Sequence, residues 1–116
     1  MKAISTILTI GIFAFFLSGL SYADETQYKA EALQHAEEAI KHGKMGHANE
    51  LLEHAKESLE LAEAANAAGA DEHMDQGIKH LEEAIKHAEM DHADVATEHV
   101  EEAVVHIRES GVGSAH

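Results

Sequence analysis

The sequence predicts an all-α protein, an up-down-up-down four-helix bundle made of two duplicated helical hairpins. Proline is absent, and the strong helix formers Ala, Glu, Leu and Lys dominate the chain. Apolar residues recur at helical spacing, one stripe per segment, with no alternating strand pattern. The segment HAEEAIKHGKMGH, residues 35–47, returns 45 positions later as HLEEAIKHAEMDH, residues 80–92. The repeat therefore predicts two equivalent hairpins.

The first 23 residues have the features of a targeting segment. Lys2 precedes an almost wholly apolar stretch at 4–20, and Ser21 and Ala23 are small residues at the −3 and −1 positions of a cleavage site. We expect residues 1–23 to be a cleaved signal peptide and the mature chain to be periplasmic, without contact to a membrane. An uncleaved N-terminal membrane anchor is the alternative.

The expected helices follow the turn signals along the chain. Gly43 to Gly46 marks the first turn, Gly69 and Asp71 are predicted to cap the link between the repeats, and residues 90–91 mark the second turn. Residues 111–116 are expected to be a flexible tail. The bundle and its four helices are predicted at residues 24–110, with helices at 26–42, 47–67, 72–89 and 92–109.

Charge and cysteine content exclude several classes of function. The formal net charge is −14, which argues against nucleic acid and anionic lipid as partners and favours cations. There is no cysteine, so neither disulfides nor a c-type haem site is available. We expect a single-domain monomer whose stability comes from helix packing or from a bound ligand.

Histidine is the most informative residue type in the chain. Ten of the eleven histidines follow one another at seven-residue steps within each predicted helical segment, with steps of five across the turns. Seven residues are almost two helical turns, so each step returns to nearly the same face. Imidazole suits copper, nickel and zinc. The candidate metal ligands are therefore His35, His42, His47, His54, His73, His80, His87, His92, His99 and His106.

Metal sites are expected between helices, because histidines seven residues apart lie about 10 Å apart along one helix. The stripe lies beside the apolar face of each helix and to the same rotational side. Two ladders are therefore expected, either within the two hairpins or between them, and the sequence does not decide which. The histidines nearest the turns and those in the middle should form better sites than His73 and His106. At the far end the first repeat has Tyr28 and Leu61 instead of histidine.

Carboxylates lie inside the stripe in the pattern H-x-x-E-x-x-x-H. An acid three residues after one histidine and four before the next neighbours both, and it can ligate a metal or orient a ring nitrogen. The carboxylates assigned to the metal sites are Glu38, Glu50, Glu83 and Glu102. Met45 and Met90 stand between the turn histidines. Their thioethers suit Cu(I), or they simply fill the turns.

These segments resemble the small metal-binding protein family of periplasmic, histidine-rich bacterial proteins. Besides residues 35–47, the resemblance is carried by LLEHAKESL at 51–59, GIKHLEEAIKH at 77–87 and VATEHVEEA at 95–103. The resemblance implies a helical bundle that binds several divalent ions, Cu(II) most favourably and Ni(II) and Zn(II) as well, for buffering, sequestration or tolerance. The ten ladder histidines match the family's positions. Tyr28 and Leu61 depart from the pattern, which places the total capacity in question.

We expect a binding protein and not an enzyme. Inward Glu-x-x-His pairs of a di-iron centre are absent from the predicted helices, and the scarcity of aromatic residues disfavours the shaped pocket of a hydrolase. The main alternative is a pH-responsive, histidine-rich periplasmic stress protein without specific metal binding, since histidines among acids take up protons near pH 6.

Overall fold

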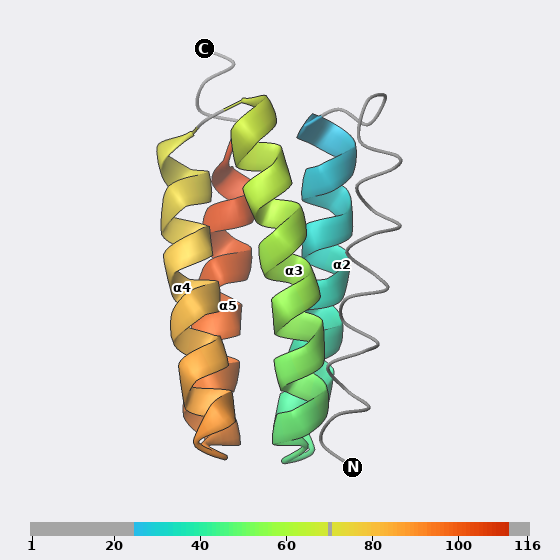
Figure 1. Cartoon of the computed structure of the whole chain (residues 1–116), viewed down its shortest axis with the longest axis vertical. Coiled ribbons are helices and arrows are strands. Elements are labelled where there is room, and N and C mark those ends of the chain that lie inside the picture. The colour runs from blue at the N-terminus through green and yellow to red at the C-terminus, as the bar shows by residue number, and fades with distance from the viewer. Residues whose placement is uncertain (1–24, 70, 112–116) are drawn as a thin grey trace.

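Four helices form a bundle in the computed structural model, which describes residues 25–69 and 71–111 (Figure 1). They are α2 (Glu25–Lys44), α3 (Ala48–Ala68), α4 (Glu72–Glu89) and α5 (Ala93–Glu109). These bounds lie within two residues of the predicted ones. The predicted signal peptide and residues 112–116 of the predicted tail lie outside the described residues. In the described ranges, no helix has the combination of length and apolar character needed to cross a membrane.

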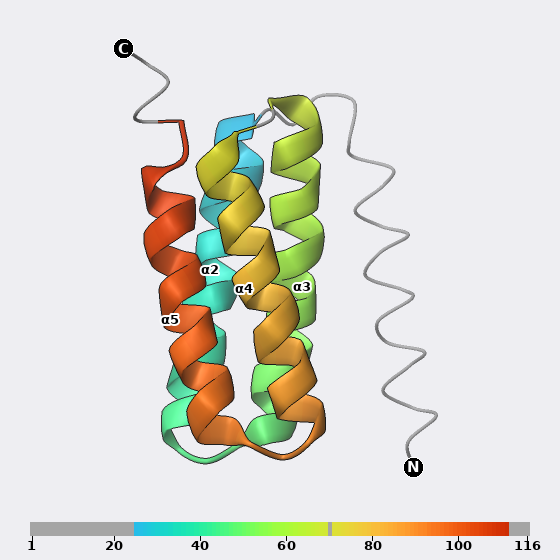
Figure 2. The same ribbon diagram turned by 90° about the vertical axis from the view of Figure 1, so that its left-hand side faces the viewer.

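The helices run up, down, up and down, which confirms the predicted four-helix bundle. Helix α2 packs most extensively on α3, and α4 on α5, while α3 with α4 and α2 with α5 close the bundle. Figures 1 and 2 show both hairpin turns at one end of the bundle and the link between α3 and α4 at the other. Each repeat therefore forms one helical hairpin.

The two hairpin turns have the same backbone construction. Gly46 in the first turn has φ of 78°, and Asp91, which stands 45 positions later, has φ of 65°. In each turn a histidine amide donates to the carbonyl oxygen of the histidine five residues earlier: His47 to His42 and His92 to His87, both at 2.9 Å. Glycine adopts this left-handed conformation without steric cost, and aspartate tolerates it better than most residues. Each turn therefore places the histidine at the start of one helix beside the histidine near the end of the preceding helix.

Asp71 organises the opposite end of the bundle. Its Oδ1 accepts hydrogen bonds from the amides of His73 and Met74, so it is the N-cap that the sequence predicts for α4. Its Oδ2 accepts from the amide of Gly111, just beyond α5, at 2.9 Å. These donors hold the pKa of Asp71 below its ordinary value, Gly111 contributing most. One carboxylate thus connects the start of α4 to the end of α5.

The core is built largely from alanine and a few larger aliphatic residues. It comprises two clusters, one towards each end of the bundle, centred on residues such as Leu51 and Val100 in one and Leu81 and Ile107 in the other. Small residues allow the helices to approach closely. A Cβ at position 43, where the chain has glycine, would collide with Thr97 Oγ1 and lie 2.7 Å from Leu51 Cδ1. The close packing sets a fixed register between neighbouring helices.

Tyr28 and Leu61 belong to this core. Their side chains are 3% and 6% exposed, whereas the equivalent histidines of the second repeat, His73 and His106, are half-buried. The first hairpin therefore continues its apolar core where the second continues its histidine stripe.

Candidate metal centres

The histidine stripes of α2 and α3 face each other and form a ladder of four rings. Neighbouring ring centroids are 6.0 Å apart for His47 and His42, 5.4 Å for His42 and His54, and 5.8 Å for His54 and His35. After His47, which stands at the N-cap position of α3, the rings alternate between α2 and α3. The predicted seven-residue stripe thus becomes, across two helices, a ladder of closely spaced imidazoles.

A longer ladder of six rings lies between α4 and α5. The same three contacts recur among His92, His87, His99 and His80, with centroids 5.3–6.1 Å apart. The ladder then continues to His106, 5.4 Å from His80, and to His73, 6.2 Å further on. Leu61 and Tyr28 stand in the equivalent places of the first hairpin, so the first ladder stops two rings earlier.

All histidine ring pairs found in the described residues lie within one hairpin. The structure therefore decides between the two arrangements left open by the sequence: the ladders run between α2 and α3 and between α4 and α5. The histidines nearest the turns gather at one end of the molecule as expected, but they pair separately in each hairpin. The core side chains, not histidines, fill the space between the hairpins.

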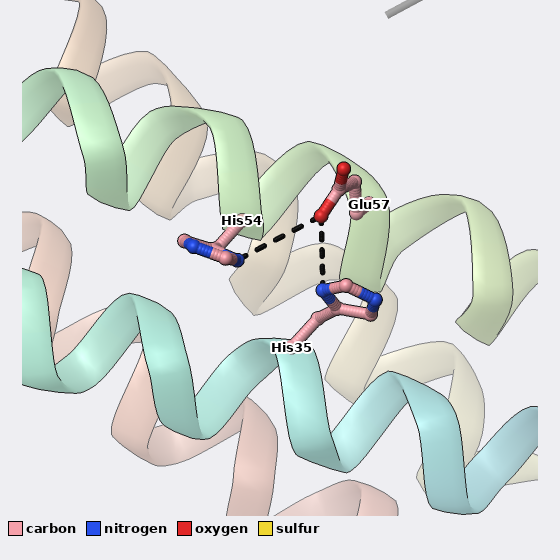
Figure 3. Close-up of side chains that lie close together, drawn as sticks. All are labelled: His35, His54 and Glu57. Atoms are coloured by element: carbon pink, nitrogen blue, oxygen red, sulfur yellow. Dashed lines mark ion pairs between the residues drawn. The ribbon is translucent and has the colours of Figure 1, made fainter. Parts of the chain in front are cut away.

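Glu57 completes a candidate metal centre between α2 and α3 (Figure 3). Its Oε1 lies 2.9 Å from His35 Nδ1 and 3.7 Å from His54 Nδ1. The side chain of Glu57 is only 21% exposed, and those of His35 and His54 are 35% and 29% exposed. Figure 3 shows one histidine reaching from α2 and the other two groups from α3, so their ligand atoms converge between the helices.

Four more clusters of this kind occur in the described residues. In each, three ligand atoms lie within 4.8 Å of one another, close enough to converge on one ion. The five clusters are His35–His54–Glu57, Glu38–His42–His54, Glu83–His87–His99, His80–Glu102–His106 and His73–His106–Glu109.

The ring nitrogens of these clusters fit a metal ion better than they fit the protein alone. Six Nδ1 atoms are shielded from solvent and make no hydrogen bond, although that of His35 lies 2.9 Å from Oε1 of Glu57. Leaving a shielded polar atom unpaired is unfavourable. A metal ion would accept these lone pairs and remove the penalty. The six atoms belong to His35, His42, His54, His73, His87 and His106.

The electrostatics of the clusters also favour a cation. Burial lowers the pKa of His80 below its ordinary value of 6.5, with Glu102 opposing the shift. This shift favours the neutral form of His80, the form that binds metal. Along α3, burial raises the pKa of Glu60, and the neighbouring carboxylates Glu57 and Glu63 raise it further. A bound cation would relieve this crowding of like charge.

The structure places most of the residues selected from the sequence in these clusters, with three exceptions. Eight histidines and three of the four carboxylates belong to a cluster. Glu50 is exposed and joins none of them. His47 and His92 are exposed at the turns and make ring contacts only, with His42 and His87.

Two carboxylates, Glu57 and Glu109, lie in clusters although they do not fit the longer sequence pattern. Each stands three residues after a ladder histidine, but no histidine follows four residues later: Leu61 occupies that place after Glu57, and Glu109 lies at the end of α5. The shorter pattern H-x-x-E selects both. The far end is also richer than expected, because His106 takes part in two of the five clusters.

Met45 and Met90 lie in the two hairpin turns. Their side chains are 59% and 54% exposed beside the turn histidines, so they make no contribution to the core. Their thioethers are accessible to a soft ion such as Cu(I).

A helical bundle with histidine–carboxylate clusters between paired helices defines a class of metal-binding bundle proteins. The model of the small metal-binding protein family, SMBP, matches residues 1–110, nearly the whole chain. The chain therefore belongs to the small metal-binding protein family, as its sequence motifs indicate. Among curated proteins, none matches the chain.

Proposed function

We propose that this protein binds several divalent transition metal ions in the clusters of its two hairpins and buffers or sequesters them in the periplasm. Cu(II) is the preferred ion, and Ni(II) and Zn(II) are also bound. The protein acts by binding and release and has no catalytic role.

The observation that carries the proposal is the set of shielded, unpaired Nδ1 atoms next to carboxylates. Two imidazoles and one carboxylate are a ligand set that copper, nickel and zinc all accept. The affinity of nitrogen and oxygen ligands rises from Ni(II) to Cu(II) and falls again at Zn(II). Without thiolates to favour soft ions, this order supports a preference for Cu(II).

The proposed location rests on residues 1–23 of the sequence. Their basic start, short apolar stretch and small residues before the predicted cleavage point are typical of exported bacterial proteins. The net charge of −14 suits a protein that collects cations in that compartment. Fractionation of cells expressing the full-length chain tests this, since retention of residues 1–23 on membrane-bound protein would support the anchor instead.

A proton-responsive role is less well supported by the geometry. Rings whose centroids lie 5.3–6.2 Å apart repel one another when protonated, which opposes collective proton uptake. A metal ion instead needs such rings to be close together and neutral.

Competition titration tests the proposed function. The purified protein is titrated at pH 7.5 with Cu(II), Ni(II) and Zn(II), each against a chelator of known affinity. We expect more than one tightly bound Cu(II) and displacement of Zn(II) by Cu(II). Zn(II) displacing Cu(II) would overturn the preference, and no tight binding of any of the three would favour the proton-responsive alternative.

A further inference from the structure

Two histidines each belong to two of the candidate clusters. His54 is a member of both clusters in the first hairpin, one with His35 and Glu57 and the other with Glu38 and His42. The ring of His54 lies between its two neighbours, 5.8 Å from His35 and 5.4 Å from His42.

His106 has the same place in the second hairpin. It belongs to one cluster with His80 and Glu102 and to another with His73 and Glu109. Its ring lies 5.4 Å from His80 and 6.2 Å from His73. The remaining cluster, that of Glu83, His87 and His99, shares no histidine with either.

A shared neutral imidazole serves one metal ion at a time. One ring nitrogen of neutral histidine carries a proton, and only the other has a lone pair to donate. Two ions on one ring would require the neutral imidazole to lose its one N–H proton as well. Adjacent clusters that meet at His54 or at His106 therefore compete for the same lone pair.

We propose that His54 and His106 are switching ligands, so that the two clusters meeting at each of them are filled alternately and not together. This rests on the proposed metal-binding function and adds its stoichiometry and its mode of exchange. Three ions bind tightly: one at His54, one at His106 and one in the Glu83–His87–His99 cluster. The ion at His54, like the ion at His106, moves between its two clusters. It stays bound to the shared ring and exchanges the remaining histidine and carboxylate ligands.

The Glu83–His87–His99 cluster influences which of its two clusters the ion at His106 occupies. His80 Nδ1 lies 3.4 Å from His99 Nδ1, so the clusters that contain these two residues are immediate neighbours. Two dications in adjacent clusters repel each other. With the Glu83–His87–His99 cluster filled, the ion at His106 is displaced towards His73 and Glu109, at the open end of the ladder.

Counting tightly bound Cu(II) in single and double variants tests the sharing. A competing chelator removes weakly held copper, and native mass spectrometry counts what remains. We expect three ions in the parent protein. His35→Ala and His42→Ala each lower the affinity but keep the count, because the ion moves to the other cluster at His54. The double variant and His54→Ala each lose one ion.

The second hairpin provides an independent repeat of the experiment. His73→Ala and His80→Ala should each keep three ions, whereas His106→Ala should keep two. Gln34→Ala and Gln76→Ala, both at exposed helical positions, are the matched controls. Far-UV circular dichroism checks that every variant stays helical, and if His54→Ala or His106→Ala unfolds, the comparison of single and double variants decides.

Five tight ions in the parent, or the loss of one ion in any of the four variants of the outer histidines, would overturn the sharing, because each cluster would then be filled independently. Absence of tight copper in the parent would instead overturn the proposed function itself.

Discussion

Glu57 shows how much one carboxylate changes the quality of a candidate centre. Its side chain lies between histidines of two helices and is 21% exposed, whereas Glu102 and Glu109 in the second ladder are 62% and 57% exposed. A carboxylate held away from water attracts a cation more strongly, because less of its charge is screened. The cluster with His35 and His54 should therefore hold its ion most tightly.

Replacing Glu57 distinguishes the local role of this carboxylate in the cluster from the effect of the protein's net negative charge. Glu57→Gln should lower the affinity of the first hairpin for Cu(II) by roughly 10–100-fold, the range found when groups that support metal ligands are removed. Glu50→Gln removes the same charge from an exposed position on α3 outside the clusters and should change the affinity little. Isothermal titration with a competing chelator measures both, and equal losses would show that only net charge matters.

The substitution Leu61→His should add capacity to the first hairpin. Position 61 is equivalent to His106 in the second, and Glu57 already stands four residues before it, as Glu102 does before His106. The new ring would lie beside His35, at some cost in stability because Leu61 is 6% exposed in the core. We expect stronger copper retention in the first hairpin and a lower Tm without metal. Unchanged retention by the folded variant would contradict the equivalence of the two hairpins.

At the scale of the helices, the turns and the link position the ladders. The turns return His47 and His92 beside the end of the preceding helix, and the link holds α4 against α5 through Asp71. Asp71 combines two roles, because it caps α4 and accepts a hydrogen bond from Gly111 at the end of α5. Its removal should therefore affect the stability of the whole bundle.

Asp71→Ala should lower the free energy of unfolding by about 0.5–2 kcal/mol, the usual cost of losing an N-cap. Urea unfolding measures this, with Glu98→Ala at an exposed helical position as the charge-matched control. Because the folded pKa of Asp71 is depressed, its contribution is present above the unfolded value of 3.8 and is lost as the pH falls below it. The difference between parent and variant should therefore shrink below about pH 4. A difference that persists at pH 2 would contradict a role for the ionised carboxylate.

At the scale of the whole molecule, the core and the charge both limit the stability of the bundle without metal. The core is rich in alanine, which buries little apolar surface per residue. A net charge of −14 opposes compaction by self-repulsion. Under the proposed function, ions bound between the helices of each hairpin should offset both effects.

Saturating Cu(II) should raise the Tm markedly. An ion that binds only the folded state, at 100 times its Kd, adds about 2.7 kcal/mol. In a domain of this size each kcal/mol corresponds to roughly 4–8 °C. Thermal unfolding followed by circular dichroism measures the shift, and removal of copper with EDTA should reverse it. An unchanged Tm with copper bound would indicate sites within single flexible segments.

Copper affinity should fall steeply between about pH 7 and pH 5, because protons compete with metal for imidazoles whose ordinary pKa is near 6.5. Burial lowers the pKa of His80 in the folded state, so below about pH 6.5 the unfolded chain binds more protons at this residue. Its contribution to stability without metal therefore also falls as the pH falls. Chelator competition at several pH values checks the first effect, and undiminished affinity at pH 5 would assign the sites to carboxylates alone.

The helices, their burial faces and the histidine stripes follow from the sequence, because each depends on periodicity within one segment. Helical spacing places residues seven apart on one face whatever the surroundings. The same argument predicts Glu38, Glu50, Glu83 and Glu102 beside the stripes, and all but Glu50 lie in a cluster. The Asp71 cap follows from its place just before α4.

The pairing of the stripes was decided by the tertiary structure. Whether the ladders lie within the hairpins or between them depends on the handedness of the bundle, which is set by core packing among all four helices. The role of Glu57 depends on α2 as well as α3, since one of its two histidine neighbours, His35, comes from the other helix. Leu61 breaks the local pattern at that place, so no argument within one helix selects Glu57 over Glu50. Contacts between segments distant in sequence depend on the stagger of packed helices, which the periodicity of a single helix does not contain.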